Sequence, residues 1–188
     1  MATRERVSLS EQQLMDCAWG ADPADDGSAA ACDGGDAAVA ISYVAKRGGA
    51  ASTEEYEYEG RPGWCRLEGT RVAARMKGFS RLPRYDDRAI KEALVTRGPL
   101  TVAMDASWDS IAFYSGGIYQ ESRCMSKPGE LDHSVVLVGY GRDPVQGAYW
   151  LIRNSWGDLW GDRGYVKVSA ENGACGVTAD ALYAVADA

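Results

Sequence analysis

The sequence contains a single histidine, His133, and no two cysteines in Cys-x-x-Cys spacing, so it offers few ligands for a structural metal ion. No stretch approaches about 20 consecutive apolar residues, which argues against a membrane-spanning helix. The residues after Met1 lack the apolar centre of a secretory signal. Basic residues number 20 against 27 acidic ones, and no basic cluster offsets the net charge of −7, so a phosphate backbone would be repelled. We therefore expect no metal, no cofactor, no nucleic acid and no membrane partner.

What is present is enough apolar sequence for a folded core. The chain has 188 residues and is 46% hydrophobic, which suits one compact domain or two small lobes. Nothing in the composition calls for a partner subunit, and we expect a monomer.

Three helices are predicted from capping residues. Ser10, followed three residues later by Gln13, forms a capping-box pattern that predicts a helix over 11–18. Helical spacing of apolar residues that ends at a Gly-Gly pair predicts a second helix over 36–47. Asp86 can cap a third, short helix that stops before Pro99.

The second half of the chain is rich in strand patterns. Strands are predicted at 100–104, 117–119, 134–140, 149–153 and 165–168. A helical first half followed by a strand-rich second half predicts an α+β fold in two lobes, 1–80 and 81–188, with the seam near residues 79–98.

Two strands place chemistry-bearing side chains near each other. His133 begins one apolar run, Asn154 ends the next, and a turn with Gly and Pro separates the runs. A turn centred between residues 143 and 144 would place His133 directly opposite Asn154, so that the amide oxygen could accept a hydrogen bond from the imidazole. An oriented imidazole activates a cysteine thiol. The plainer interpretation is a histidine whose hydrogen bonds are satisfied at the end of a strand.

Several sequence blocks decide between these interpretations. They are Val7-Ser8-Leu9-Ser10-Glu11-Gln12-Gln13-Leu14-Met15-Asp16-Cys17, Cys32-Asp33-Gly34-Gly35, Phe113 to Tyr119, Leu131-Asp132-His133-Ser134 with the run to Gly141, Tyr149 to Gly157 with Trp160-Gly161 and Gly164-Tyr165, and Cys175-Gly176-Val177. In this order, and over nearly the whole chain, they resemble the papain-like cysteine peptidase family.

The resemblance implies a papain-like fold, with a helical left lobe, an antiparallel β-barrel-like right lobe and an active-site cleft between them. It makes His133 the general base and later the acid, and Asn154 the residue that orients it. Trp156 would shield their hydrogen bond from water, although ordinary core packing would also explain this tryptophan.

The family's nucleophile lies in a Cys-Gly-Ser-Cys-Trp type segment, and these 188 residues contain no such segment. We therefore expect the left lobe to be incomplete and the chain alone to be inactive. An incomplete sequence is favoured over a catalytically dead module that binds extended peptides. A separate polypeptide that supplies the cysteine is a third possibility.

By the same resemblance, Cys17 pairs with Cys65 and Cys124 pairs with Cys175. Cys32 is left unpaired, because its partner in the family belongs to the missing segment. Cys32 is expected to be structural, since it precedes the glycines that offer backbone hydrogen bonds to substrate.

The resemblance also assigns substrate-binding positions. They are Gly34, Gly35, Asp36, Ala103, Asp132, Ser134 and Asp180. The aspartates at 36 and 180 would make the second pocket acidic and tolerant of Arg or Lys, unless both are merely solvated.

The expected activity follows from the same family. A single histidine leaves no paired-histidine exopeptidase loop, so endopeptidase action on proteins or peptides is expected. Propeptide or cystatin-like inhibitors are possible partners, and the compartment would be lysosomal, vacuolar or extracellular.

Overall fold

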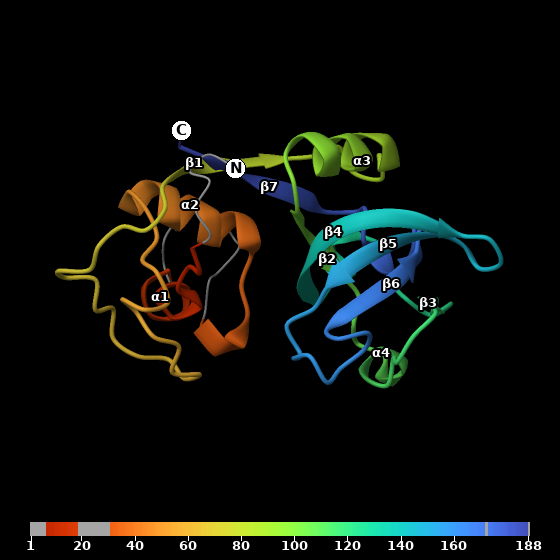
Figure 1. The fold of residues 1–188 in the computed structure, drawn as a ribbon, viewed down its shortest axis with the longest axis horizontal. Helices are drawn as coiled ribbons and strands as arrows, with labels where there is room; N and C mark the ends of the chain where they lie inside the picture. The colour runs from red at the N-terminus through yellow and green to blue at the C-terminus, as the bar shows by residue number, and fades with distance from the viewer. Residues whose placement is uncertain (1–6, 19–30, 172, 188) are drawn as a thin grey trace. The chain divides into compact units, whose positions relative to one another are not determined.

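The computed structural model describes residues 7–18, 31–171 and 173–187. The chain divides into two compact units (Figure 1), of which unit 1 comprises residues 1–80 with 184–188 and unit 2 comprises residues 81–183.

In unit 1, helix α1 (Glu11–Cys17) begins as its sequence predicts, because the Oγ atom of Ser10 accepts the Gln13 N–H at 2.9 Å. Only half of the predicted capping box forms. The Gln13 side chain turns away from Ser10, accepts the Ala51 N–H at 2.7 Å and donates to the Gly49 carbonyl at 3.4 Å. Gln13 therefore binds the helix to residues 49–51 instead of closing its own cap.

Helix α2 (Ala37–Arg47) also has the predicted ends. The Asp36 carboxylate accepts the Ala38 N–H at 2.6 Å, and Gly48 terminates the helix in the left-handed conformation, with φ 88°. A single turn of 3-10 helix, η1 (Ala31–Asp33), precedes α2. The predicted Cys17–Cys65 disulfide forms, so the expectation from family resemblance is confirmed.

The strands of the described residues form one seven-stranded sheet in the order β1-β7-β2-β4-β5-β6-β3. The strands are β1 (Met76–Arg81), β2 (Leu100–Met104), β3 (Ile118–Tyr119), β4 (His133–Asp143), β5 (Gly147–Arg153), β6 (Tyr165–Ser169) and β7 (Ala181–Ala186). All five predicted strands appear, whereas β1 and β7 were not predicted. Because β1 and β3 are the two ends of this order, the sheet is open and is not a closed barrel.

Alternation along the strands builds the core of unit 2. In β2 the buried residues are Leu100, Val102 and Met104, as a half-buried strand requires. The neighbouring strands contribute Val135, Leu137, Trp150, Ile152, Val166 and Val168 to the same cluster. This core fixes which face of β2 and β4 turns away from it, and the candidate site begins on these two strands.

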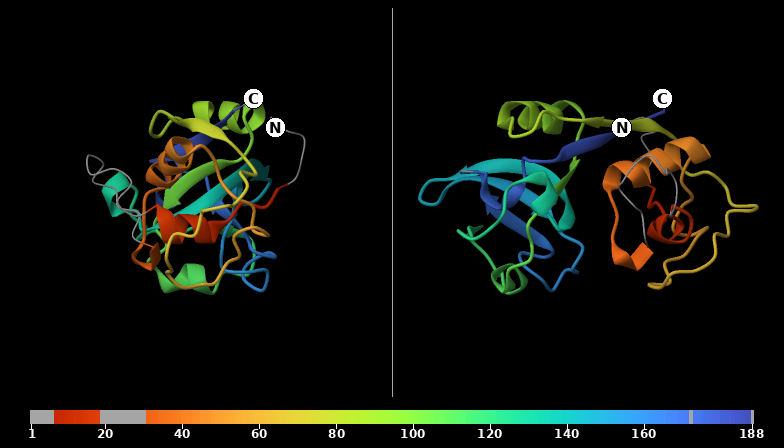
Figure 2. Two further views of the ribbon diagram at one scale, coloured as in Figure 1. Left: turned by 90° about the vertical axis from the view of Figure 1, so that its left-hand side faces the viewer. Right: turned by 180° about the vertical axis from the view of Figure 1, so that it is seen from behind.

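Helix α3 (Asp87–Thr96) lies beside β4 and β7, and helix α4 (Asp109–Ala112) lies on the opposite side of unit 2, near β3 (Figures 1 and 2). Helix α3 is capped by Asp86, as predicted, and buries Ile90 and Ala93 in the core. Helix α4 was not predicted. Two 3-10 turns complete the unit, η2 (Pro128–Glu130) and η3 (Ala174–Gly176). The second predicted disulfide, Cys124–Cys175, also forms.

Candidate active site

The site begins with His133, the first residue of β4. In the strand register His133 lies opposite Met104 of β2, which is buried at 2% exposure, while the imidazole is half-buried. Its Nε2 atom lies 2.9 Å from the Oδ1 atom of Asn154. The histidine and the asparagine predicted from the sequence are therefore hydrogen-bonded to each other.

The partners of Asn154 identify the proton on the ring. Asn154 Oδ1 also accepts the Ser155 N–H at 2.8 Å, which establishes that this atom is the carbonyl oxygen. An amide oxygen only accepts, so the Nε2 atom of His133 must carry the hydrogen. In the neutral ring the basic lone pair is then on Nδ1. The bond to Asn154 leaves the opposite ring nitrogen available to take a proton.

Burial and a backbone hydrogen bond fix the position of Asn154. It follows β5 directly, is 5% exposed, and donates its backbone N–H to the Gly164 carbonyl at 2.9 Å. Gly164 has φ 83°, and a β-carbon there would overlap the guanidinium group of Arg153. Only glycine fits this position easily. The conformation of Gly164 thus supports the residue that orients the imidazole.

Trp156 packs beside the imidazole. The two ring centroids are 5.1 Å apart, with planes tilted by 32°. Trp156 also contacts Trp160 edge-on at 5.1 Å, and the Trp160 indole donates to the Ile111 carbonyl at 3.0 Å. Trp156 remains 41% exposed, so it covers one side of the histidine and keeps the other side of its own ring in solvent.

The predicted register between β4 and β5 was wrong. Asp143 pairs with Gly147 around a three-residue turn, and a β-bulge lies between Leu137 and Gly139. Beyond the bulge Val136 pairs with Arg153, so Asn154 does not lie directly opposite His133. The hydrogen bond forms nonetheless, because the chain leaves β5 at Arg153 and brings the Asn154 side chain back to the ring. An inserted bulge residue has no clear signature in the sequence.

Three predicted substrate-binding residues gather next to His133 in unit 2. Ser134 follows the histidine and pairs with Ala103 across the β2–β4 ladder. The Ala103 N–H donates to the Asp180 carbonyl at 3.1 Å. The backbones of Asp180, Ala103 and Ser134 therefore lie side by side in one row.

Asp132 lies on the other side of the histidine. Its N–H donates to the Met104 carbonyl at 3.3 Å, and its carboxylate accepts the Ala106 N–H at 2.8 Å. Met104 and Ala106 thus hold Asp132, the residue before His133, through two hydrogen bonds.

The remaining predicted residues lie in unit 1. Gly34 has φ 108° and open space where a β-carbon would stand. Asp36 caps α2, and Cys32 is exposed and is the free cysteine of the described residues.

Asp105 was missed by sequence reasoning. It is 1% exposed and accepts hydrogen bonds from the Ser107 N–H and hydroxyl, the Trp108 indole and the Met125 N–H. Burial alone would raise the pKa of this carboxyl, but these hydrogen bonds outweigh burial and hold the pKa below its ordinary value. The only signal in the sequence was an acidic residue directly after an apolar strand.

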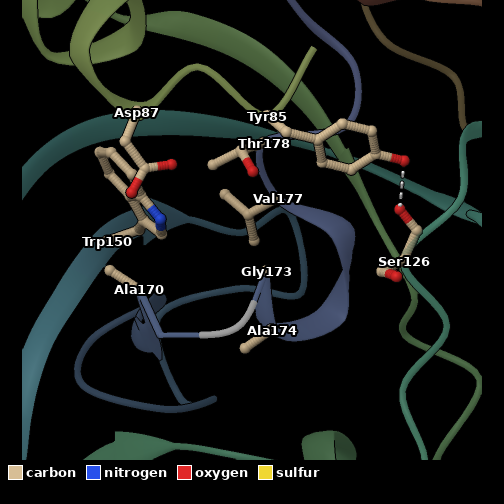
Figure 3. A pocket seen from close by; sticks show the side chains of 9 residues that line it. All are labelled: Tyr85, Asp87, Ser126, Trp150, Ala170, Gly173, Ala174, Val177 and Thr178. Carbon is tan, nitrogen blue, oxygen red and sulfur yellow. Dashed lines mark hydrogen bonds between the residues drawn. The ribbon is translucent and has the colours of Figure 1, made fainter.

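A separate cavity of about 380 Å³ lies elsewhere in unit 2 (Figure 3). Its lining residues are Tyr85, Asp87, Ser126, Trp150, Ala170, Gly173, Ala174, Val177 and Thr178. The Tyr85 hydroxyl closes one side by donating to the Ser126 carbonyl at 3.0 Å. None of the residues around His133 lines this cavity.

Within residues 7–18, 31–171 and 173–187, no group of three or more His, Cys, Asp or Glu residues is arranged to hold a metal ion. Nor does any of the described helices have the length and apolar character needed to cross a membrane.

Comparison with known proteins places this geometry in a family. A family model described as papain family cysteine protease matches residues 1–185. Procathepsin L of Rattus norvegicus is 41% identical over 98% of this chain, and the cathepsin L-like peptidase of Aedes aegypti is 41% identical over 96%. The matches cover 54% and 51% of those relatives, so the chain spans about half the length of the curated relatives it matches.

Solved structures agree in fold. The digestive procathepsin L2 proteinase from Tenebrio molitor larval midgut superposes with a TM-score of 0.85 and 38% identity, over 96% of this chain and 54% of that one. Bromelain from Ananas comosus, in complex with the E64 inhibitor, superposes with a TM-score of 0.84 and 30% identity, over 98% of this chain and 81% of that one. The fold is papain-like, and the chain belongs to the papain family of cysteine proteases.

Proposed function

We propose that this chain carries the base and the orienting residue of a cysteine endopeptidase that hydrolyses peptide bonds through a Cys-His-Asn mechanism. The observation that carries the proposal is the hydrogen bond from His133 Nε2 to Asn154 Oδ1, which leaves Nδ1 as the basic atom. A buried acceptor that is itself held by Ser155 and Gly164 keeps the ring in one orientation.

In this mechanism Nδ1 of His133 takes the proton of a cysteine thiol, and the resulting thiolate attacks the carbonyl carbon of the scissile bond. The imidazolium then gives that proton to the leaving amine as the carbon–nitrogen bond breaks. Water, deprotonated by the same nitrogen, hydrolyses the acyl-enzyme and restores the thiol. An imidazolium beside the sulfur lowers the thiol pKa by several units, which makes thiolate available near neutral pH.

We infer that the thiol comes from sequence outside these 188 residues. Four of the five cysteines are in disulfides. The fifth, Cys32, lies two residues before Gly34, the first of the two glycines expected to bind substrate backbone. The alternative is a catalytically inactive module that retains the substrate-binding residues and captures extended peptides.

Family names support the wider proposal. Relatives are named procathepsin L, which fits control by a propeptide, and two from Homarus americanus are named digestive cysteine proteinases. We therefore propose protein and peptide substrates, inhibition by a propeptide or a cystatin-like protein, and a lysosomal, vacuolar or extracellular site of action.

Reconstitution tests the proposal. The residues that precede the matched region in rat procathepsin L are fused before Met1. The propeptide is then removed, and hydrolysis of a fluorogenic peptide is measured with and without E64. We expect E64-sensitive hydrolysis. His133→Ala should lower kcat/KM by about 10²–10⁴-fold, as loss of a general acid–base group does. Asn154→Ala should lower it by about 10- to 100-fold, because an ion-strengthened hydrogen bond contributes about 1.5–3 kcal/mol.

Three results would contradict the proposal. Hydrolysis that survives His133→Ala would exclude this histidine as the base. Hydrolysis by the unfused chain that is lost in Cys32→Ser would make Cys32 the nucleophile. A fused, folded protein that binds peptides without cleaving them would favour the binding module.

A further inference from the structure

Arg81 and Asp180 form an ion pair next to the row of predicted substrate-binding residues. The Nη1 atom of Arg81 lies 2.5 Å from the Oδ1 atom of Asp180, and the two residues are 99 positions apart in sequence. The side chains are 37% and 20% exposed, so the pair is partly withdrawn from water. An ion pair in this environment is screened less than one on the open surface.

The backbone holds the two residues in place. The N–H of Leu82, the residue after Arg81, donates to the Ala181 carbonyl at 2.8 Å. The Tyr85 N–H donates to the Thr178 carbonyl at the same distance. Since the neighbouring residues are already paired, the side chains lose less conformational freedom in forming the ion pair than two free surface chains would.

The position of Asp180 relates the ion pair to substrate. Its carbonyl accepts the Ala103 N–H, Ala103 pairs with Ser134, and Ser134 follows His133. Two strand spacings, about 10 Å, therefore separate Asp180 from β4, the strand that begins with His133. An extended peptide covers about 7 Å in two residues, so a side chain two residues before the cleaved bond can reach this position.

We propose that Arg81 determines specificity by neutralising Asp180, so that the second pocket takes uncharged side chains in preference to Arg or Lys. This inference rests on the proposed function and names its substrate class. Tolerance for basic residues, as expected from the sequence, requires a carboxylate that is not already paired. Here Asp180 is paired with Arg81, and Asp36 caps α2 in the other unit.

A basic substrate side chain would have to displace the Arg81 guanidinium, which is held by the backbone next to it. It would gain one contact to the carboxylate by breaking another of the same kind, and it would also leave its own hydration shell. An apolar side chain meets no such competition. The pocket should therefore rank Leu at least equal to Arg.

Binding to the 188-residue chain tests the inference without requiring hydrolysis. N-acetyl-leucine amide and N-acetyl-arginine amide are titrated to tens of millimolar while NMR follows the amides of Ala103 and Ser134. We expect the wild type to bind the leucine compound at least as tightly as the arginine compound. Arg81→Ala should lower the Kd of the arginine compound about tenfold and change that of the leucine compound by less than about twofold.

Two further variants make the result specific. The double variant Arg81→Ala with Asp180→Asn should not show the tenfold lower Kd for the arginine compound, because it has no carboxylate at position 180. Arg123→Ala is the matched control, because it frees Glu121 from a 2.7 Å ion pair elsewhere in unit 2 and should leave both Kd values unchanged.

The inference is overturned if the wild type already binds the arginine compound tenfold more tightly. It is equally overturned if Arg81→Ala behaves like Arg123→Ala, or if neither compound shifts Ala103 and Ser134 in any variant. These outcomes are separate from those of the proposed function. A reconstituted enzyme that cleaves peptides with the same Leu-to-Arg preference before and after Arg81→Ala would contradict this inference but not the proposed function.

Discussion

Replacing Asp105 by asparagine tests how a buried carboxylate stabilises the loops beside the candidate site. The carboxylate accepts four hydrogen bonds, two on Oδ1 from Ser107 and one each on Oδ2 from Trp108 and Met125. Asparagine can keep the two bonds on its oxygen, but its NH₂ group would face the indole N–H and the Met125 N–H. Each donor left without an acceptor costs about 1–3 kcal/mol. With two such donors, we expect Asp105→Asn to lower the free energy of unfolding by about 2–6 kcal/mol.

The same substitution has a defined pH dependence. The pKa of Asp105 is lowered in the folded state, so its charge contributes stability that is present above the unfolded pKa, about 3.9, and is lost as pH falls through the folded pKa. The gap in free energy of unfolding between wild type and Asp105→Asn should have its full size at pH 6 and should become smaller as pH falls below about 4.

Urea unfolding at pH 6 and at pH 3, followed by tryptophan fluorescence, measures this gap. Asp158→Asn is the control, because Asp158 is an exposed carboxylate paired with Arg153 in the same unit, and it should cost less than about 0.5 kcal/mol. A gap below 0.5 kcal/mol for Asp105→Asn at pH 6, or a gap of equal size at both pH values, would refute the reasoning.

Two further predictions concern the frame around the site. Replacing both Cys124 and Cys175 by serine opens a link across 51 residues, which the chain-entropy model values at about 4 kcal/mol. In urea unfolding the variant should be less stable than the wild type by this amount without reductant, and the difference should vanish with reductant, which opens Cys17–Cys65 in both proteins. Gly164→Ala places a β-carbon against Arg153 at a φ of 83° and should cost about 1–3 kcal/mol and weaken the His133–Asn154 bond, whereas Gly129→Ala, which meets nothing within 4 Å, should do neither. Equal stability of the two glycine variants would show that Gly164 is not strained by a side chain.

Local signals in the sequence predicted the helices well. Ser10 and Asp86 each cap the helix they were expected to cap, because a short polar side chain can bond to the exposed N–H groups of the first turn without help from the rest of the fold. The second half of the capping box failed because Gln13 found better partners at residues 49–51, a tertiary contact that the local pattern cannot contain.

The residues of the candidate site could be predicted from the sequence, but their arrangement in space could not. His133 and Asn154 could be named from their strand ends and from family resemblance, yet their register depends on the bulge between Leu137 and Gly139. The Arg81–Asp180 ion pair joins the last residue of β1 to the residue before β7, and neither strand was predicted, so nothing in the sequence placed a positive charge beside that carboxylate. Asp105 could not be recognised as buried because its donors come from two separate loops.

Asn154 holds the imidazole of His133 through Nε2 and leaves Nδ1 as the base. Because His133 is the only histidine, NMR of the imidazole nitrogens and their protons in the 188-residue chain reports on this residue alone. We expect an Nε2–H resonance that is protected from exchange, shows a cross-relaxation peak to the Ser155 amide, and disappears in Asn154→Ala. A ring with no protected proton in either protein, or one that carries its proton on Nδ1, would contradict this assignment.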